Sequence, residues 1–347
     1  MESLFRAAQL PRFIVRGIDI LKEIPKYLRE VNLTNPAMMV ADQQTYDVAG
    51  KTIVESLDFE PEVFLIESSD MSTVDSCINE LETNDSNFLF GVGGGSAIDV
   101  AKLASFRFGI PFISVPTALS HDGIASSRAS ILIEGKLTSF PAHTPVAIIA
   151  DLRPIAKAPR RLFSAGCGDA IANYTAVLDW QLAHRVKGER YGDYSGQLAL
   201  MTAKTIMREV EKMAADYHYG LGVLLEALIS SSVAMSITGS TRPASGSEHL
   251  FAHALEQIAP GRSLHGERCG VGTILMAYLH DKEWQKIKYT LETLKGATTA
   301  KDLKIDEETL IEALLMAHTI RKDRYTVLGT GLTRKAAENL VAETKVV

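Results

Sequence analysis

The feature that most constrains this chain is a run of glycines between an apolar segment and a helix-like segment. Asn87 to Val92 has the pattern of a buried strand, Gly93-Gly94-Gly95 follows, and Val100 to Phe106 has the character of a helix. Consecutive glycines let backbone amides approach a ligand without interference from a Cβ, and Ser96 is placed to cap a helix whose N-terminus favours an anion. The pattern predicts a strand, a pyrophosphate-binding loop and a helix. Its spacing differs from the common G-x-G-x-x-G fingerprint, so a tight turn without a ligand stays open on this stretch alone.

The first half of the chain alternates short apolar runs with helix-like stretches, which is typical of a parallel sheet covered by helices. The strand-like runs are 36–41, 63–67, 87–92, 111–115 and 146–150, with helix-like stretches at 44–57 and 72–83. In open parallel sheets, ligands bind beyond the carboxyl ends of the strands, where Asp42, Gly93 to Ser96 and Pro116 to Ser120 fall. Asp42 is placed to bind the ribose hydroxyls of a nucleotide and to repel a 2′-phosphate. A solvated aspartate at a strand end fits the same pattern.

Beyond about residue 155 almost all of the sequence has helical periodicity. A Pro- and Arg-rich connection at 151–161 leads into segments at 169–185, 195–213, 219–237, 248–259, 270–279, 281–294, 307–320 and 334–344. The expected fold class is therefore α/β. A Rossmann-like parallel-sheet domain at 1–155 is followed by an all-helical C-terminal domain at 156–347.

Composition narrows the possible functions. The 347 residues are 46% hydrophobic and 22% charged, with a formal net charge of −6 and no basic cluster. This argues against a nucleic-acid partner and against attraction to an anionic membrane. Met1 to Lys26 lacks the apolar core of a signal peptide, and no uninterrupted apolar run reaches about 18 residues. We expect a cytoplasmic chain without membrane insertion that acts on a small molecule.

The three cysteines, Cys77, Cys167 and Cys269, are an odd number and form no C-x-x-C pair. This pattern indicates neither a disulfide framework nor a thiolate zinc cluster. We expect all three to be small core residues.

The second half contains a group of residues that could bind a metal. His249 and His253 stand four residues apart on one predicted helix, so both side chains project from the same face. The H-E-x-x-H motif of zinc peptidases is absent. His265 follows the break at Pro260-Gly261, and Asp169 is expected to open a long helix after a Gly166-Cys167-Gly168 turn. One carboxylate with imidazoles around an open position fits a catalytic Zn²⁺ or Fe²⁺ site, although two histidines on a helix are more often structural or exposed.

Several motifs together identify a family resemblance. In chain order they are Gly93-Gly94-Gly95-Ser96-Ala97-Ile98-Asp99, Pro116-Thr117-Ala118-Leu119-Ser120-His121-Asp122-Gly123, Gly166-Cys167-Gly168-Asp169, Arg242-Pro243-Ala244-Ser245-Gly246-Ser247-Glu248-His249 with His253, and Leu264-His265-Gly266-Glu267. The sequence resembles the sn-glycerol-1-phosphate dehydrogenases of archaeal type. These lie within the superfamily of glycerol dehydrogenases, iron-containing alcohol dehydrogenases and dehydroquinate synthases. The Ser-His-Asp-Gly and Arg-Pro-Ala-Ser-Gly-Ser-Glu-His segments look specific to the glycerol-1-phosphate branch.

The resemblance implies a role for each matching position. It makes Asp169, His249 and His265 the metal ligands, usually of zinc, with Asp169 and His253 as catalytic residues and Asp122, Asp169 and His253 in contact with the substrate. It places the nicotinamide dinucleotide on Gly94, Gly95, Ser96, Ala97, Ile98, Thr117, Ser120 and Ser126, with Asp42 at the adenosine ribose. A fourth ligand or a partner of the ligands is the alternative role for His253. The family usually has a glutamine or similar residue where this chain has Arg268.

The implied function is the NAD(P)H-dependent, metal-dependent and reversible reduction of dihydroxyacetone phosphate to sn-glycerol 1-phosphate, in a cleft between the two domains. This reaction supplies the glycerophosphate backbone of archaeal-type ether lipids. The candidates for binding the substrate phosphate are Lys204, Arg242, Arg262 and Arg268. The alternatives are a glycerol dehydrogenase, a dehydroquinate-synthase-like lyase and a nucleotide-binding regulator. A homo-oligomer is expected.

Overall fold

The computed structural model of the chain describes residues 8–347. These residues form two compact units, one ending at Ala158 and the other spanning Pro159–Val347. The sequence predicted a division between residues 155 and 156. Each unit is described by itself.

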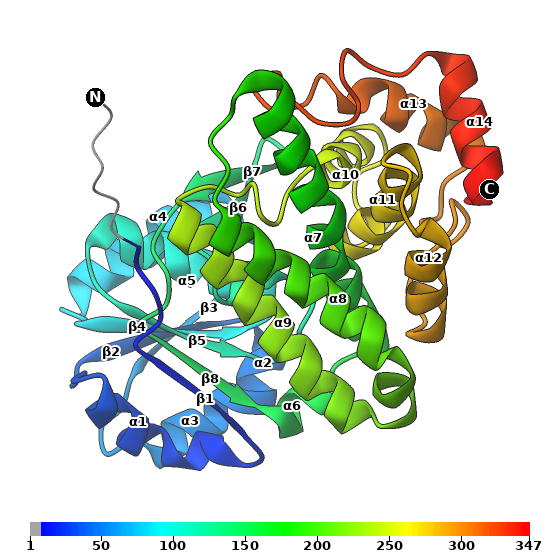
Figure 1. The fold of residues 1–347 in the computed structure, drawn as a ribbon. Helices are drawn as coiled ribbons and strands as arrows, with labels where there is room; N and C mark the ends of the chain where they lie inside the picture. Colours follow the sequence, from blue (N-terminus) through cyan, green and yellow to red (C-terminus); the bar gives the residue numbers. More distant parts are fainter. Residues whose placement is uncertain (1–7) are drawn as a thin grey trace. The chain divides into compact units, whose positions relative to one another are not determined.

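The first unit is built around a six-stranded parallel sheet with the strand order β1-β8-β5-β4-β2-β3 (Figure 1). Its strands are β1 (Phe13–Gly17), β2 (Ala37–Ala41), β3 (Glu62–Leu65), β4 (Phe88–Gly93), β5 (Phe112–Pro116) and β8 (Ala147–Asp151). The fully buried strands β2, β4, β5 and β8 have continuous apolar sequences, which is why the sequence predicted them. The sequence analysis missed β1, because this edge strand alternates half-buried and exposed residues.

Helices cover this sheet (Figure 1). They are α1 (Ile24–Glu30), α2 (Gln43–Thr45), α3 (Lys51–Ser56), α4 (Met71–Thr83), α5 (Gly95–Phe108) and α6 (Leu152–Lys157), with the 3-10 turns η1 (Ile20–Glu23) and η3 (Asp122–Ile124) and the π-helical turn η2 (Tyr46–Gly50). Alternate residues of β4, namely Phe88, Phe90 and Val92, pack into one core with α1 and α3. Helix α5 packs on β4, so the glycine loop joins two elements that are fixed against each other.

Two features near the glycine loop were not predicted. An antiparallel hairpin of β6 (Arg128–Ile133) and β7 (Lys136–Pro141) stands apart from the parallel sheet. The fully buried Lys102 of α5 fixes this hairpin in place, because its Nζ donates to Asp99 Oδ1 at 2.8 Å, to the Gly123 carbonyl at 2.6 Å and to the Arg128 carbonyl at 2.7 Å. Asp99 Oδ2 also accepts from the Ser130 backbone N–H at 2.9 Å. One buried ion pair therefore joins α5, the 117–126 segment and β6.

Replacing Lys102 with methionine should destabilise the first unit by about 3–5 kcal/mol, because the Asp99 carboxylate would stay buried without its partner. Thermal unfolding followed by circular dichroism measures this effect. The matched control is Lys51→Met, which breaks an exposed ion pair with Asp47 and should leave the melting temperature unchanged. Equal melting temperatures for the wild type and Lys102→Met would contradict the role given to this ion pair.

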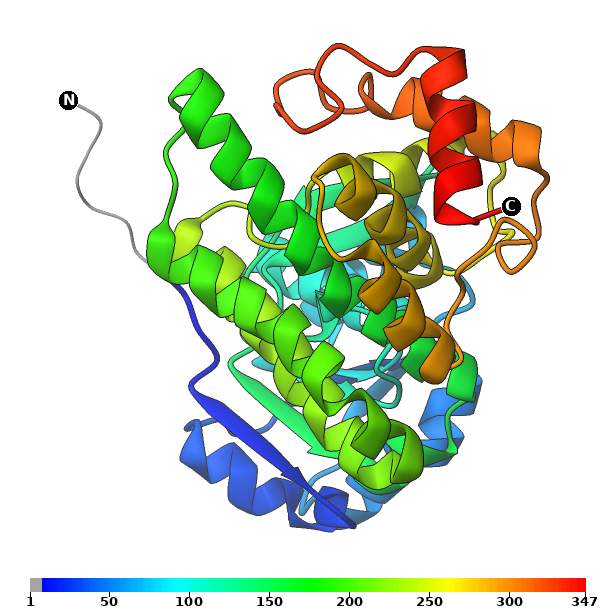
Figure 2. The same ribbon diagram turned by 45° about the vertical axis from the view of Figure 1, so that its right-hand side comes forward.

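Every regular element described in the second unit is a helix (Figure 2). The helices are α7 (Arg160–Lys187), α8 (Asp193–Ala215), α9 (Tyr217–Thr238), α10 (Ser247–Ile258), α11 (His265–Leu279), α12 (Trp284–Thr293), α13 (Glu307–Ala317) and α14 (Arg334–Thr344). Helices α8 and α9 lie side by side, and α7, α10 and α11 pack against one another. Among the described residues, α9 alone has the length and composition to cross a membrane, and 67% of its apolar window is buried inside the protein. The expected fold class, an α/β unit followed by a helical one, is confirmed.

Two local predictions about helix starts were wrong. Gly166-Cys167-Gly168 is not a turn, because α7 already begins at Arg160 and Asp169 lies well inside it. The glycines there serve a close helix contact rather than a chain reversal. Ser96 is not a helix cap, since Gly94 is the N-cap of α5 and Ser96 lies within its first turn.

Candidate metal centre and nucleotide loop

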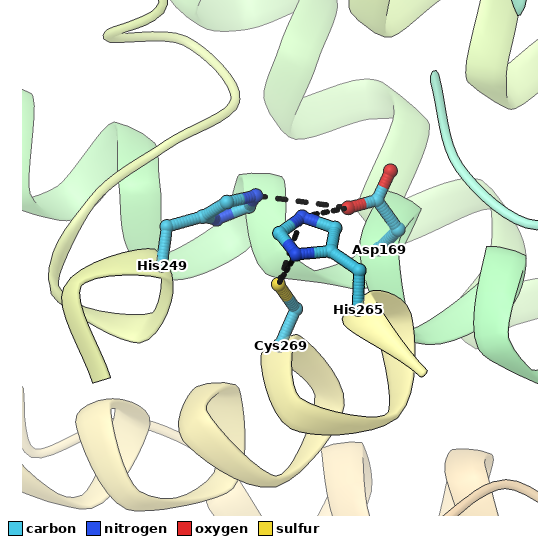
Figure 3. Close-up of side chains that lie close together, drawn as sticks. All are labelled: Asp169, His249, His265 and Cys269. Atoms are coloured by element: carbon cyan, nitrogen blue, oxygen red, sulfur yellow. Dashed lines mark hydrogen bonds and ion pairs between the residues drawn. The ribbon is translucent and has the colours of Figure 1, made fainter. Parts of the chain in front are cut away.

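Three helices of the second unit bring together four side chains that could bind a metal (Figure 3). Asp169 comes from α7, His249 from α10, and His265 and Cys269 from α11. One ligand atom of each side chain lies within 4.8 Å of the others. The sequence singled out the first three, which the structure brings together. It treated Cys269 only as a core residue, although its spacing of four residues from His265 placed both on one helix face.

Close packing of two helix backbones positions Asp169 beside His265. A Cβ on Gly266 would lie 1.9 Å from the Ala165 carbonyl oxygen, and a Cβ on Gly168 would lie 2.2 Å from the Gly266 carbonyl oxygen. Neither position therefore has room for any residue but glycine. The two glycines let α7 and α11 touch at the level of the cluster.

The spacing of the ligand atoms fits one divalent ion. Asp169 Oδ1 lies 3.6 Å from His249 Nε2 and 3.5 Å from His265 Nε2. Two oxygen or nitrogen ligands at ~2.0–2.1 Å from one tetrahedral zinc ion are about 3.4 Å apart. One carboxylate with two imidazoles is a donor set that suits Zn²⁺ or Fe²⁺. The residues present therefore fit the metal that the sequence analysis expected.

The buried carboxylate of Glu248 orients His249. Its Oε1 lies 2.9 Å from His249 Nδ1 and accepts from the Gly246 backbone N–H at 2.6 Å, while Oε2 accepts from the Thr175 hydroxyl at 2.7 Å. A proton on Nδ1 leaves the lone pair on Nε2, the atom that faces Asp169. The sequence did not predict this role for Glu248. Its one indication there is that Glu248 directly precedes His249, a candidate metal ligand.

Replacing Glu248 with glutamine should weaken metal binding about 10- to 100-fold, because the amide keeps the shape of the side chain and loses its negative charge. Competition with a chromogenic chelator measures the affinity directly. Glu292→Gln, an exposed change on α12, is the control that should bind the metal as tightly as the wild type. Unchanged affinity in Glu248→Gln would show that Glu248 only supports the fold.

The pKa values of His249 and His265 are shifted in opposite directions. Burial opposes a charge on His249, but Cys269, Asp169 and Glu248 raise its pKa well above the usual value. Burial lowers the pKa of His265 far below its usual value, so this imidazole is neutral. A metal ion would replace the proton that His249 carries.

His253 lies beside the cluster rather than in it. Its ring centroid is 6.2 Å from that of His249 and 5.8 Å from that of His265. Burial lowers the pKa of His253 to about 3, and the positive charges of His249, Arg268, Arg321 and Arg324 act in the same direction. His253 is therefore a neutral imidazole beside the candidate ligands.

The glycine loop of the first unit is closely packed at Gly93 and open at Gly94. Gly93 has φ +155°, and a Cβ there would lie 2.9 Å from the Ala97 side chain, so only glycine fits. A Cβ on Gly94 would meet nothing within 4 Å, which leaves this side of the loop open. Ala97 and Ile98 are fully buried, so they can offer a ligand only their backbone groups. Ser96 is exposed within the first turn of α5.

The remaining residues expected at the nucleotide lie in the segment after β5. Buried Thr117 donates its backbone N–H to the Gly93 carbonyl at 2.9 Å, which ties this segment to the glycine loop. Ser120 is half-buried, Asp122 is half-buried at the start of η3, and Ser126 is buried. The glycine loop and the 117–126 segment thus follow two neighbouring strands, β4 and β5.

Asp42 has a structural role that the sequence did not predict. Its Oδ1 accepts from the Thr45 backbone N–H at 2.8 Å, and Thr45 Oγ1 accepts from the Asp42 backbone N–H at 3.1 Å, which forms a capping box for α2. Asp42 is half-buried directly after β2. One carboxylate oxygen caps the helix, so a ribose would have to bind the other.

Two of the four cations proposed for the substrate phosphate already have carboxylate partners. Buried Arg242 pairs with Glu189 and donates to the Tyr325 carbonyl at 2.9 Å. Buried Arg268 pairs with Glu256 at 2.6 Å and donates to the Ser263 carbonyl. Lys204 and Arg262 are exposed.

Comparisons with known proteins show the family of the chain. Residues 15–159 match the family described as iron-containing alcohol dehydrogenase. The chain is 48% identical over 342 residues to glycerol-1-phosphate dehydrogenase (NAD(P)+) of Methanosarcina mazei, covering 98% of this chain and 96% of the relative. It is 46% identical to the enzyme of the same name from Pyrococcus furiosus, covering 98% of this chain and 99% of the relative.

A solved structure shows the same fold. The crystal structure of a probable glycerol dehydrogenase from Sinorhizobium meliloti superposes with a TM-score of 0.80 at 20% identity, covering 99% of this chain and 100% of that chain. The two relatives described above are far more similar in sequence over nearly the full length. The chain therefore belongs to the glycerol-1-phosphate dehydrogenase family.

Proposed function

We propose that this chain catalyses the reversible, NAD(P)H-dependent and metal-dependent reduction of dihydroxyacetone phosphate to sn-glycerol 1-phosphate, the backbone of archaeal-type ether lipids. Family membership supports the substrate and the cofactor. The observation that carries the chemistry is the convergence of Asp169 Oδ1 with the Nε2 atoms of His249 and His265. The name shared by the relatives favours neither a glycerol dehydrogenase nor a dehydroquinate-synthase-like lyase.

We assign the metal to Asp169, His249 and His265, and we infer Zn²⁺, with Fe²⁺ as the alternative. When bound, the ion polarises the substrate ketone and stabilises the negative charge that develops on its oxygen. Asp169 supplies a negative charge that attracts the cation to the two imidazoles. Glu248 holds His249 with Nε2 toward the site.

His253 is proposed to orient the substrate and to pass a proton to its oxygen as the hydride reaches the carbonyl carbon. Its neutral imidazole would give the proton of one ring nitrogen to the substrate oxygen while the other nitrogen takes up a proton from water, so it ends the step neutral. The position one helical turn from His249 supports this role. Asp122 stays a proposed substrate contact, supported by its match to the family motif.

The nicotinamide dinucleotide is assigned to the first unit. The backbone N–H groups at the start of α5, from Gly94 to Ile98, are proposed to bind the pyrophosphate, and the open side of Gly94 supports this assignment. Thr117, Ser120 and Ser126 are proposed to line the nicotinamide side. When bound, the cofactor donates or accepts the hydride, and the protein supplies its orientation.

Replacing Asp42 with asparagine should raise the ratio of kcat/KM for NADPH to that for NADH about tenfold, if ~1.4 kcal/mol of repulsion of the 2′-phosphate is removed. Asparagine keeps the oxygen that caps α2, so the change tests charge rather than folding. Steady-state kinetics with both cofactors measures the ratio, and Asp47→Asn on the neighbouring turn is the control. A ratio that does not move would leave Asp42 with its capping role alone.

The product's stereochemistry tests the proposed reaction. The enzyme is incubated with dihydroxyacetone phosphate and NADH or NADPH, and the product is then offered to an sn-glycerol-3-phosphate dehydrogenase with NAD+. We expect rapid oxidation of the reduced cofactor and a product that the second enzyme leaves untouched. No turnover of dihydroxyacetone phosphate, or a product that the second enzyme consumes, would refute the proposal.

The same proposal implies a cellular compartment and an oligomeric state for the enzyme. We place it in the cytoplasm, where nicotinamide cofactors and phosphorylated trioses are present, and we expect a homo-oligomer. The mostly buried apolar window of α9 is consistent with this placement.

A further inference from the structure

Arg321 and Arg324 lie near His253, beside the candidate metal centre, and Arg242 adjoins them. Arg324 is 9% exposed, and its guanidinium donates to the Ser245 carbonyl and, at 2.8 Å, to Thr241 Oγ1. Both groups that accept from this guanidinium, a carbonyl and a hydroxyl, are uncharged. A buried cation with neutral partners favours a nearby anion.

Two charged neighbours of Arg324 are cationic, Arg321 and Arg242, and two are acidic, Asp323 and Glu248. Arg321 lies one turn earlier, and its carbonyl accepts from the Arg324 backbone N–H at 3.0 Å. Arg242 donates to the carbonyl of Tyr325, the residue after Arg324, and adjoins Thr241 in sequence. Among the described residues, the exposed guanidinium of Arg321 has no hydrogen bond or ion pair. Burial and the charges of Arg321 and Arg242 lower the pKa of Arg324 to about 10.

This cluster adjoins the helix that bears two of the site's histidines. Ser245, which accepts from Arg324, lies two residues before α10, the helix of His249 and His253. The charges of Arg321 and Arg324 also reach His253. The cations are therefore near the group proposed to orient the substrate.

We propose that Arg321 and Arg324 bind the phosphate of the substrate, with Arg321 as the exposed donor and Arg324 as the buried one. This rests on the proposed function and assigns its phosphate subsite. Arg321 and Arg324 thus take the phosphate-binding role for which the sequence suggested Lys204, Arg242, Arg262 and Arg268. Arg242 and Arg268 are neutralised by Glu189 and Glu256, and Lys204 and Arg262 are exposed cations outside this cluster.

The test compares two ketones that differ by the phosphate. Arg321→Ala should lower kcat/KM for dihydroxyacetone phosphate about 10- to 100-fold, the effect of losing one charge-assisted hydrogen bond, and should lower it far less for dihydroxyacetone. The inhibition constant of inorganic phosphate against dihydroxyacetone phosphate should rise in parallel. Lys322→Ala, which removes the adjacent exposed cation, is the matched control and should leave both values unchanged.

A second variant, Arg324→Lys, tests the buried arginine. If Arg324→Lys fails to fold, Arg321→Ala still tests the proposal. Equal losses on both ketones, or an unchanged inhibition constant for phosphate, would overturn the proposal. A wild-type enzyme that does not reduce dihydroxyacetone phosphate would instead refute the proposed function.

A separate observation concerns Cys269. Its Sγ lies 3.5 Å from His265 Nε2, and a sulfur at ~2.3 Å and a nitrogen at ~2.0–2.1 Å from one tetrahedral ion are about 3.5 Å apart. The thiol is fully buried against Ala172 and Ala252, which follow Asp169 and His249 by three residues. Its polar neighbours are the imidazoles of His265 and His249. We infer that Cys269 is a fourth donor to the proposed metal, with a fifth position left for the substrate oxygen, and that it favours thiophilic ions such as Zn²⁺ and Co²⁺ over Mn²⁺ and Mg²⁺.

Cobalt substitution tests the role of Cys269 without measuring activity. Enzyme carrying one Co²⁺ per chain should show a sulfur-to-cobalt charge-transfer band in the near ultraviolet, and Cys269→Ser should bind Co²⁺ without that band. Cys167→Ser, a buried change on α7, is the control that should keep it. A wild-type cobalt enzyme without the band, or a band that survives in Cys269→Ser, would overturn the inference. A wild-type chain that binds no ion would refute the metal centre itself.

Discussion

Asp169→Asn is expected to lower kcat/KM at least a thousandfold and to leave the purified enzyme without its metal. Asp169 Oδ1 lies 3.6 Å from His249 Nε2 and 3.5 Å from His265 Nε2, so its negative charge stands next to both proposed histidine ligands. A Lewis acid that stabilises the transition state by about 4 kcal/mol raises the rate about a thousandfold, and this is the factor that would be lost with the metal. Elemental analysis of the variant and steady-state kinetics measure the two effects.

Two controls separate loss of metal from loss of fold. Asp193→Asn, an exposed change at the start of α8, should keep both the metal and the activity. Removing the metal from the wild type with a chelator should abolish turnover and leave NADH binding intact, because the glycine loop belongs to the other unit. An Asp169→Asn enzyme with one ion per chain and normal turnover would show that the cluster is not the catalytic centre.

Dihydroxyacetone phosphate is expected to be reduced with a kcat/KM at least about a hundredfold higher than that of dihydroxyacetone. Each charge-assisted hydrogen bond lost with the phosphate is worth ~1.5–3 kcal/mol, and two such bonds give this ratio or more. Part of the difference should appear in kcat, because the phosphate also holds the carbonyl against the reacting groups. Parallel assays with NADH and NADPH give both constants. Comparable efficiency on the two ketones would favour a glycerol dehydrogenase.

Much of the fold could be predicted because its buried elements have simple patterns. Strands β2, β4, β5 and β8 are almost entirely apolar, and helices such as α8 and α14 of the second unit bury one periodic apolar face. The edge strand β1 and the hairpin of β6 and β7 escaped prediction, since partly exposed strands lack a continuous apolar run. The start of α7 was misplaced because Gly166 and Gly168 resemble a turn when their neighbours are unknown.

The sequence by itself determined the kinds of groups available: a glycine loop after a strand, a carboxylate and histidines at helical spacing, and motifs in the order of one family. Only the tertiary structure decided which of these groups meet. Contact between α7 and α11 at Gly168 and Gly266 brings Asp169 to His265 across almost a hundred residues, and packing alone places Glu248 behind His249. The same holds for Cys269, Arg321 and Arg324. Their side-chain types are ordinary, and their roles depend on neighbours that come from distant parts of the chain.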